Sequence, residues 1–167
     1  MTYHTRLARL DDEPFLWEML YYAAAMSIDG VQSAEAAKTN SYLHPYVADW
    51  GRAGDLGVIA ETTDGMLIGA AWVRVLSGAE HRYSEVDAAT PELAIAVHPS
   101  IIRQGVGTTL LHRLYAEAAP IYPAIVLSVR ESNPARRLYE RMGFQIVNET
   151  INRVGGRSFV MLRRDDQ

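Results

Sequence analysis

Strands and helices alternate in the pattern of apolar positions along the 167-residue chain. Short runs rich in Val, Ile and Ala predict strands, and apolar residues that return every three or four positions predict helices. The strands are expected at residues 4–9, 56–61, 66–76, 93–97, 124–129, 144–150 and 158–162. Helices are expected at 33–38, 41–50 and 105–119. Two further helices are expected to begin after the capping candidates Asp11 and Asp12 and after Asn133. With the short helical segments at 33–38 and 41–50 counted as one, this β-α-α-β-β-β-α-β-α-β-β order predicts an α/β fold in which helices flank a single mixed β-sheet.

Three segments in the middle of the chain have patterns of their own. Residues 93–97 form a continuous apolar run, which is typical of a central strand buried on both faces. Residues 77–90 form a polar loop, and loops of this length in a compact domain are often functional. Between the second and third strands, Thr62-Thr63-Asp64-Gly65 predicts a hairpin turn. The central strand and the polar loop are therefore the first places to look for a site.

Composition narrows the class of protein. Apolar residues make up 49% and charged residues 22% of the chain, as in ordinary globular proteins, and the length predicts one domain over residues 1–167. The sequence contains no cysteine, which excludes disulfides, thiolate nucleophiles and cysteine-based metal sites. The five histidines show no shared metal-ligand spacing, so no metal is expected.

Charge and hydropathy make nucleic acid and membranes unexpected partners. The net charge is −4, whereas phosphate binding needs clustered positive charge. The longest apolar stretches, such as residues 20–26 and 67–73, are far shorter than the ~20 residues that span a bilayer. The chain does not begin with a basic segment followed by an apolar run, so no secretory signal is expected. These features predict a soluble, cytoplasmic protein.

The strongest chemical signal lies where the strand at 93–97 is followed by a turn and a helix. Gly105 and Gly107 at the start of this helix leave room for a ligand to approach the backbone. The free N–H groups of a first helical turn and the helix dipole favour an anion such as a pyrophosphate. Leu110 occupies the place of the third glycine of a dinucleotide-binding motif, and the only lysine, Lys38, lies outside any P-loop position. Those two phosphate-binding motifs are therefore excluded.

Three blocks between residues 91 and 144 resemble the GCN5-related N-acetyltransferase (GNAT) family. Ile102-Arg103-Gln104-Gly105-Val106-Gly107 falls on the family's phosphate-binding motif Gln/Arg-x-x-Gly-x-Gly/Ala, with Ile102 at the position of the usual Gln or Arg. Asn133-Pro134-Ala135-Arg136-Arg137-Leu138-Tyr139-Glu140-Arg141-Met142-Gly143-Phe144 resembles the family's Asn-to-Tyr helix, and Pro91-Glu92-Leu93 resembles its entry into the central strand. The resemblance implies the GNAT-like acyl-CoA N-acyltransferase fold, with a CoA-binding core at 91–144 and substrate-side helices at 11–50.

The resemblance also implies an activity, the transfer of an acetyl group from acetyl-CoA, as co-substrate, to the amine of a small molecule or peptide. The implied groups that bind acetyl-CoA are the backbone of Ala96 and Val97, the side chains of Asn133 and Arg136, and the turn Arg103, Gln104, Gly105, Val106, Gly107 and Thr108. Tyr139 matches the family's tyrosine that faces the CoA sulfur, where a phenol can donate a proton to the leaving thiolate. Members of the family often pair, which allows a homodimer.

The base that deprotonates the amine is expected to be a carboxylate. Glu92, at the start of the central strand, is the first candidate, with Glu61, Glu85, Asp87 and ordered water as alternatives. These acidic residues are expected to gather around a protonated amine. A non-catalytic acyl-CoA-binding module and a structural or nucleotide-binding α/β domain are the alternative functions. The motifs do not identify the acceptor amine.

Overall fold

All strands of the protein join one β-sheet in the computed structural model, which describes residues 1–101 and 103–165. The seven strands lie in the order β1-β2-β3-β4-β5-β7-β6. They are β1 (Tyr3–Leu7), β2 (Leu56–Thr62), β3 (Leu67–Arg74), β4 (Glu92–Val97), β5 (Ala124–Arg130), β6 (Gln145–Ile151) and β7 (Arg157–Arg164). β4 and β5 run parallel, and the other neighbouring strands run antiparallel. The predicted mixed sheet and the predicted order of elements are confirmed.

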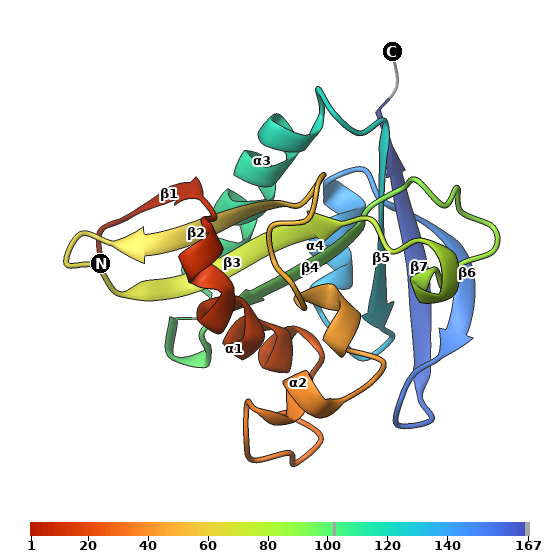
Figure 1. Ribbon diagram of the computed structural model, residues 1–167, viewed down its shortest axis with the longest axis horizontal. Helices are drawn as coiled ribbons and strands as arrows, with labels where there is room; N and C mark the ends of the chain where they lie inside the picture. The colour runs from red at the N-terminus through yellow and green to blue at the C-terminus, as the bar shows by residue number, and fades with distance from the viewer. Residues whose placement is uncertain (102, 166–167) are drawn as a thin grey trace.

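Helices cover both faces of this sheet (Figure 1). One face, called the α1 face below, carries α1 (Glu13–Ala23) and α2 (Ala36–Thr39), and the opposite α3 face carries α3 (Val106–Ala118) and α4 (Arg136–Arg141). Successive residues of a strand point to opposite faces, so each strand contributes to both layers. On β4, Leu93 and Ile95 pack in the cluster under α3, whereas Ala94 packs in the cluster under α1.

The polar loop between β3 and β4 also packs on the α1 face. Its Tyr83 and Val86 are buried against Val126 of β5 and against Val160 and Leu162 of β7. Val126 belongs to the α1 face because its neighbours along β5, residues 125 and 127, pack under α3. The loop therefore covers the part of the α1 face around Val126, Val160 and Leu162, and α1 covers the β3–β4 half.

The helix expected at residues 41–50 is wrong. A 3-10 turn, His44–Tyr46, forms there instead. Arg74 Nη1 donates to the carbonyls of Pro45 (3.0 Å) and Ala48 (2.6 Å), and Trp72 Nε1 donates to the carbonyl of Tyr46 (3.0 Å). These tertiary hydrogen bonds from β3 occupy carbonyls that a longer helix would use. The helix expected at 33–38 is likewise reduced to the single turn of α2.

The chain enters α1 through a 3-10 turn, Leu10–Asp12, and not through a side-chain cap. Both carboxylate oxygens of Asp12 accept hydrogen bonds from Arg6 of β1, at 2.8 and 2.9 Å. The Arg9 amide donates to the same carboxylate at 2.7 Å. Asp12 stands at the N-cap position of α1, as predicted, but its carboxylate ties β1 to the start of the helix and makes no capping hydrogen bond.

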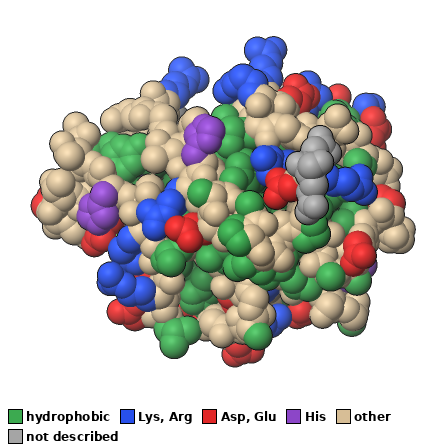
Figure 2. Space-filling view, turned by 90° about the horizontal axis from the view of Figure 1, so that it is seen from above, with side chains coloured by type: hydrophobic (Ala, Val, Ile, Leu, Met, Phe, Trp, Pro, Cys, Tyr) green, Lys and Arg blue, Asp and Glu red, His purple; other side chains and the backbone are tan. Residues whose placement is uncertain are grey.

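The surface carries charges of both signs. On the face shown in Figure 2, basic, acidic and apolar side chains are interspersed and do not form one basic surface. Within residues 1–101 and 103–165, no helix is long and apolar enough to cross a membrane.

Candidate active site

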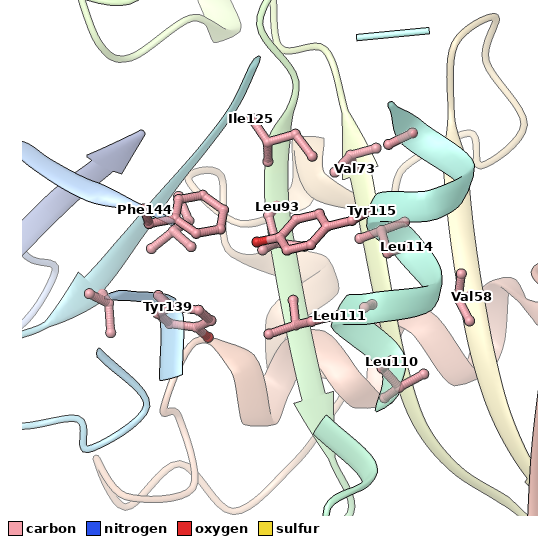
Figure 3. Close-up of a cluster of buried hydrophobic side chains, with 14 of the residues drawn as sticks. Val58, Val73, Leu93, Leu110, Leu111, Leu114, Tyr115, Ile125, Tyr139 and Phe144 are labelled. Carbon is pink, nitrogen blue, oxygen red and sulfur yellow. The ribbon is translucent and has the colours of Figure 1, made fainter. Parts of the chain in front are cut away.

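The parallel strands β4 and β5 separate shortly after they begin. Their pairing in the described residues is limited to Glu92 and Val126, supported by a hydrogen bond from the Val126 amide to the Pro91 carbonyl at 3.0 Å. Beyond this point the two strands diverge, and Figure 3 shows their arrowheads pointing away from each other. The later residues of β4, from Ile95 to Val97, are correspondingly only half-buried. The divergence opens a gap in the middle of the sheet.

The backbone of β4 offers unpaired groups to this gap. The His98 amide donates to Ile68 of β3 at 2.8 Å, and in an antiparallel ladder alternate residues turn their N–H and C=O groups toward the partner strand. Ala96, which is two residues before His98, therefore points its amide toward β3. Ile95 and Val97 point theirs toward β5. The Ala96 amide was expected to face the ligand, but the Ile95 amide faces the gap in its place. The Val97 amide faces the gap as expected.

The N-terminus of α3 lies beside the end of β4. A Cβ placed on Gly107 would lie 3.8 Å from Val97 Cγ2, and a Cβ on Gly105 would meet nothing within 4 Å. The first hydrogen bond of the helix joins the Thr109 amide to the Gly105 carbonyl at 3.1 Å. The amides of Gly107 and Thr108 come before it, so they have no acceptor inside the helix. This open, amide-rich turn fits the expected pyrophosphate cradle.

Two features of the chain shape this turn. Gly105 has φ +79°, a left-handed conformation that glycine adopts without strain, and Arg103 has φ +65°. Arg103 and Gln104 are exposed, whereas the Val106 side chain is buried in the core under α3. Val106 can therefore contribute only its backbone to a ligand. Ile102, the position that departs from the family motif, lies outside the described residues.

Asn133 and Arg136 are engaged within the protein. The Asn133 side-chain oxygen accepts from the Ala135 amide at 2.9 Å and so caps the turn that leads into α4. The Arg136 guanidinium lies 5.0 Å from the centroid of the Phe159 ring and 3.8 Å from a carboxylate oxygen of Glu140. Contact of Arg136 with a bound CoA would require it to leave these partners.

Tyr139 projects from α4 into the α3 face of the gap. Its side chain is 7% exposed and packs edge-on against Phe144, with ring centroids 6.0 Å apart. Figure 3 shows its hydroxyl directed toward β4. Burial raises the pKa of Tyr139 to about 12, so the hydroxyl keeps its proton at neutral pH. The Tyr139 hydroxyl is therefore in the proton-bearing form that its predicted role requires.

Glu92 lies on the opposite side of the sheet, since it shares the α1 face with Ala94. Arg74 is directly across the ladder from it, yet the Arg74 guanidinium is bound to Asp55 at 2.7 Å. In the described part of the chain, the Glu92 carboxylate has no ion pair or hydrogen bond. It is 5% exposed, and burial raises its pKa to about 8. A carboxylate with such a pKa can accept a proton near neutral pH.

The other acidic candidates do not join Glu92. Glu61 on β2 pairs with Arg6 at 3.0 Å, and Glu85 accepts from Asn148 of β6 at 3.1 Å. β2 is two strands away from β4 and β6 is three strands away, which corresponds to about 10 Å and about 14 Å across the sheet. Asp87 is exposed and accepts from the Ala89 amide within its own loop. The predicted acidic cluster is therefore not formed.

The sequence patterns miss three groups that border the gap. The Ile95 backbone follows from the period of two along a strand once Val97 is assigned to the gap. Tyr83 and Ser128 lie on the α1 face beside β5 and match no motif. Only the loop's polar character pointed to the region of Tyr83. Among the described residues, no group of three or more histidines or carboxylates could hold a metal ion.

Comparison with known proteins agrees with this arrangement. A sequence model of the acetyltransferase (GNAT) domain matches residues 54–146, which is more than half of the chain. The chain therefore belongs to the GNAT family of acetyltransferases. No curated protein sequence matches it.

Solved structures share the fold over almost the whole chain. A GCN5-related N-acetyltransferase from Kribbella flavida is 19% identical, with a TM-score of 0.70 and 98% of each chain covered. The spermidine/spermine N-acetyltransferase SpeG from Vibrio cholerae, in complex with manganese ions, is 19% identical, with a TM-score of 0.62 and coverage of 98% of this chain and 92% of that one. A protein assigned as a phosphinothricin N-acetyltransferase is 17% identical, with a TM-score of 0.71 and coverage of 99% and 100%. At these identities the likeness establishes the fold.

Proposed function

We propose that this protein transfers the acetyl group of acetyl-CoA to a primary amine, by direct attack of the amine within a ternary complex. The observation that carries the proposal is the gap between β4 and β5. It opens beside the amide-rich start of α3, with Glu92 on one face of the sheet and Tyr139 on the other. The sequence has no cysteine that could carry the acetyl group, which fits direct transfer.

The backbone is proposed to bind and orient acetyl-CoA, which supplies an activated acetyl thioester. The amides of Gly107 and Thr108 hold the pyrophosphate, with the positive end of the α3 dipole behind them. The unpaired groups of Ile95 and Val97 hydrogen-bond the pantetheine arm as an added strand would. An amide of β4 that faces the gap can also donate to the thioester oxygen, where negative charge develops during attack.

Two side chains are proposed to move protons on opposite sides of the gap. Glu92 accepts a proton from the ammonium form of the acceptor, because only a neutral amine can attack. Its raised pKa makes it a stronger base than an exposed carboxylate. Tyr139 donates a proton to the departing CoA sulfur and stays protonated until then. Glu61 and Glu85 lie too far across the sheet to replace Glu92.

The acceptor class is supported only in general by the comparisons. The structures named for spermidine and for phosphinothricin are both named as N-acetyltransferases, which supports an amine acceptor for this chain as well.

Binding and turnover are tested separately. Isothermal titration calorimetry with acetyl-CoA is expected to show saturable binding by the wild type, at least tenfold weaker in Gly107→Asp, because that substitution puts a negative side chain into the cradle. Thr63→Asp is the control for the added charge, since Thr63 is exposed in the β2–β3 turn and already carries a side chain, whereas Gly65 of the same turn has φ +90°. Unchanged affinity in a folded Gly107→Asp variant would contradict the placement of the pyrophosphate.

Turnover is measured as amine-dependent release of free CoA thiol, with the acetylated product identified by mass spectrometry. Release with at least one primary amine is expected. Tight acetyl-CoA binding without release for any amine would instead support the non-catalytic acyl-CoA-binding module.

A further inference from the structure

One arginine on the α1 face has no counter-ion in the part of the chain that the structure describes. Arg82, on the loop between β3 and β4, stacks its guanidinium on the rings of Tyr42 and Tyr46, with its central carbon 3.8 and 4.9 Å from the ring centroids. Its Nη2 donates to the Tyr42 carbonyl, while Nη1 is fully enclosed and has no hydrogen-bond partner in residues 1–101 and 103–165. Within the described residues, no carboxylate lies at ion-pair distance from it.

Three other arginines of the protein do have a counter-ion. Arg52, Arg74 and Arg130 pair with Glu80, Asp55 and Asp29 at 3.2, 2.7 and 2.7 Å. An enclosed N–H of a charged group that lacks an acceptor is destabilising, so native structures rarely keep one without a reason. Arg82 Nη1 is therefore a charged donor that remains available to an anion.

A second orphaned group lies beside Arg82. The Tyr83 side chain is 7% exposed, and among the described residues its enclosed hydroxyl makes no hydrogen bond of good geometry, although the side chains of Ser128 and Tyr42 lie close enough to interact with it. The side chains of Ser128, Tyr42 and Arg82 surround this hydroxyl, and burial raises the pKa of Tyr83 to about 12. The hydroxyl is thus a proton-bearing donor at neutral pH. Among the described residues, Arg82 Nη1 and the Tyr83 hydroxyl are therefore two donors on the same loop whose hydrogen bonds are incomplete.

This pair of donors borders an opening over the sheet. Ser128 lies on β5, which has strands on both sides, yet Ser128 is exposed between the buried residues 127 and 129. A central-strand residue is exposed only where its face is uncovered, so the α1 face is open above Ser128. Glu92 pairs with Val126, which is two residues before Ser128 on the same face. The opening therefore begins about 7 Å along the strand from the Glu92 position.

We propose that the acceptor is an amine that also carries a carboxylate, as an amino acid does, and that Arg82 and Tyr83 bind this carboxylate while Glu92 faces the amine. The proposal rests on the proposed acetyltransferase function. The Tyr42 side chain, which is 44% exposed and lies over the Arg82 guanidinium, has to turn aside to admit the carboxylate. A polyamine would place a second positive charge near Arg82 and leave both donors unsatisfied.

The test compares matched acceptors. The α-amino acids, each paired with its α-carboxamide, and spermidine are assayed by thiol release, and kcat/KM is determined for each. The acid of the best pair is expected to exceed its amide and spermidine at least tenfold. Arg82→Gln and Tyr83→Phe are expected to lower kcat/KM for the acid by about 10- to 100-fold, the range of a charge-assisted hydrogen bond, with little effect on the amide. Arg82→Lys restores part of the loss, and Arg52→Gln is the matched arginine control.

A binding measurement keeps this proposal separate from the proposed activity. The N-acetyl derivatives of the same acids and amides are titrated into CoA-loaded protein by calorimetry, which requires no turnover. Tighter binding of the acids that depends on Arg82 supports the carboxylate site even if no acceptor is acetylated, a result in which the proposed activity alone fails. Equal binding of acids and amides, a preference for spermidine, or equal losses for acid and amide in Arg82→Gln would overturn the carboxylate site.

Discussion

The Glu92 carboxylate is expected to make the stability of this protein depend on pH. Glu92 is buried without an ion-pair partner among the described residues, and burial raises its pKa from 4.5 to about 8. In the unfolded chain the same group titrates near its ordinary value. Between these two pH values the folded protein keeps a proton that the unfolded chain has lost. The free energy of unfolding must therefore fall as the pH rises through this window.

The size of this effect follows from the two pKa values. One pH unit corresponds to about 1.36 kcal/mol, so the window from 4.5 to about 8 corresponds to about 5 kcal/mol. Glu92→Gln keeps the shape of the side chain and cannot ionise. We expect the variant and the wild type to have similar free energies of unfolding near pH 4.5. At pH 8.5 the variant is expected to be more stable by about 5 kcal/mol.

Urea denaturation measured at intervals from pH 4.5 to 8.5 tests this expectation. The difference between the two proteins isolates Glu92, because the other titrating groups are common to both, and equal m-values show that the unfolded states are comparable. Glu35→Gln, at an exposed position on the turn before α2, is the matched control and is expected to leave the pH profile unchanged. Parallel profiles for the wild type and Glu92→Gln would refute the buried, unpaired assignment.

Ionisation of Glu92 is expected to lower the stability of the protein but to raise its catalytic rate. A base with a pKa of about 8 is mostly protonated at pH 7, so kcat/KM should rise about tenfold per pH unit below 8 and level off above it. Glu92→Gln should lose activity most strongly near pH 8 and recover in part at pH 10, where the free amine is abundant. A variant that matches the wild type from pH 6 to 10 would exclude Glu92 as the base.

Two further substitutions test the acid and the core. Tyr139→Phe removes the proton donor but retains the ring that packs on Phe144, so kcat should fall by about 100-fold or more with little change in acetyl-CoA affinity by calorimetry; full activity would reduce Tyr139 to a packing residue. Asp55→Asn breaks an ion pair whose side chains are 2% and 4% exposed and leaves the Arg74 charge buried, so the free energy of unfolding should fall by about 3–5 kcal/mol in urea. A loss below about 1 kcal/mol would show that Arg74 finds another partner.

Periodicity predicted the regular elements well where they depend on local contacts. The helix expected at 105–119 is α3, Val106–Ala118, and the strand expected at 56–61 is β2, Leu56–Thr62. The prediction failed at residues 41–50, where the apolar spacing is helical. Arg74 and Trp72 of β3, which lie more than twenty positions further along the chain, take the carbonyls of that segment. The sequence of residues 41–50 alone does not show this competition for backbone hydrogen bonds.

The candidate site, too, was predictable where it depends on local sequence and unpredictable where it depends on contacts between distant residues. Gly105 and Gly107 at a helix start predict an anion cradle because a missing side chain and free first-turn amides are local properties. The motifs also place Glu92 and Tyr139 at the central strand and on the helix that follows β5. They do not show that Glu61 and Glu85 are bound by Arg6 and Asn148 and lie away from Glu92. Those partners come from other strands of the sheet.

The sequence by itself determined the order of the elements, the buried central strand and the glycine turn, because each depends on side-chain periodicity or backbone freedom within a few residues. Only the tertiary structure decided that β4 and β5 part after one paired position, so that Ile95 and Val97 offer their backbone to the gap. It also decided that, among the residues the structure describes, Glu92 has no counter-ion because Asp55 binds Arg74, and that Arg82 has none either. Burial and charge pairing depend on which distant residues meet across the sheet, and these set the chemistry of the site.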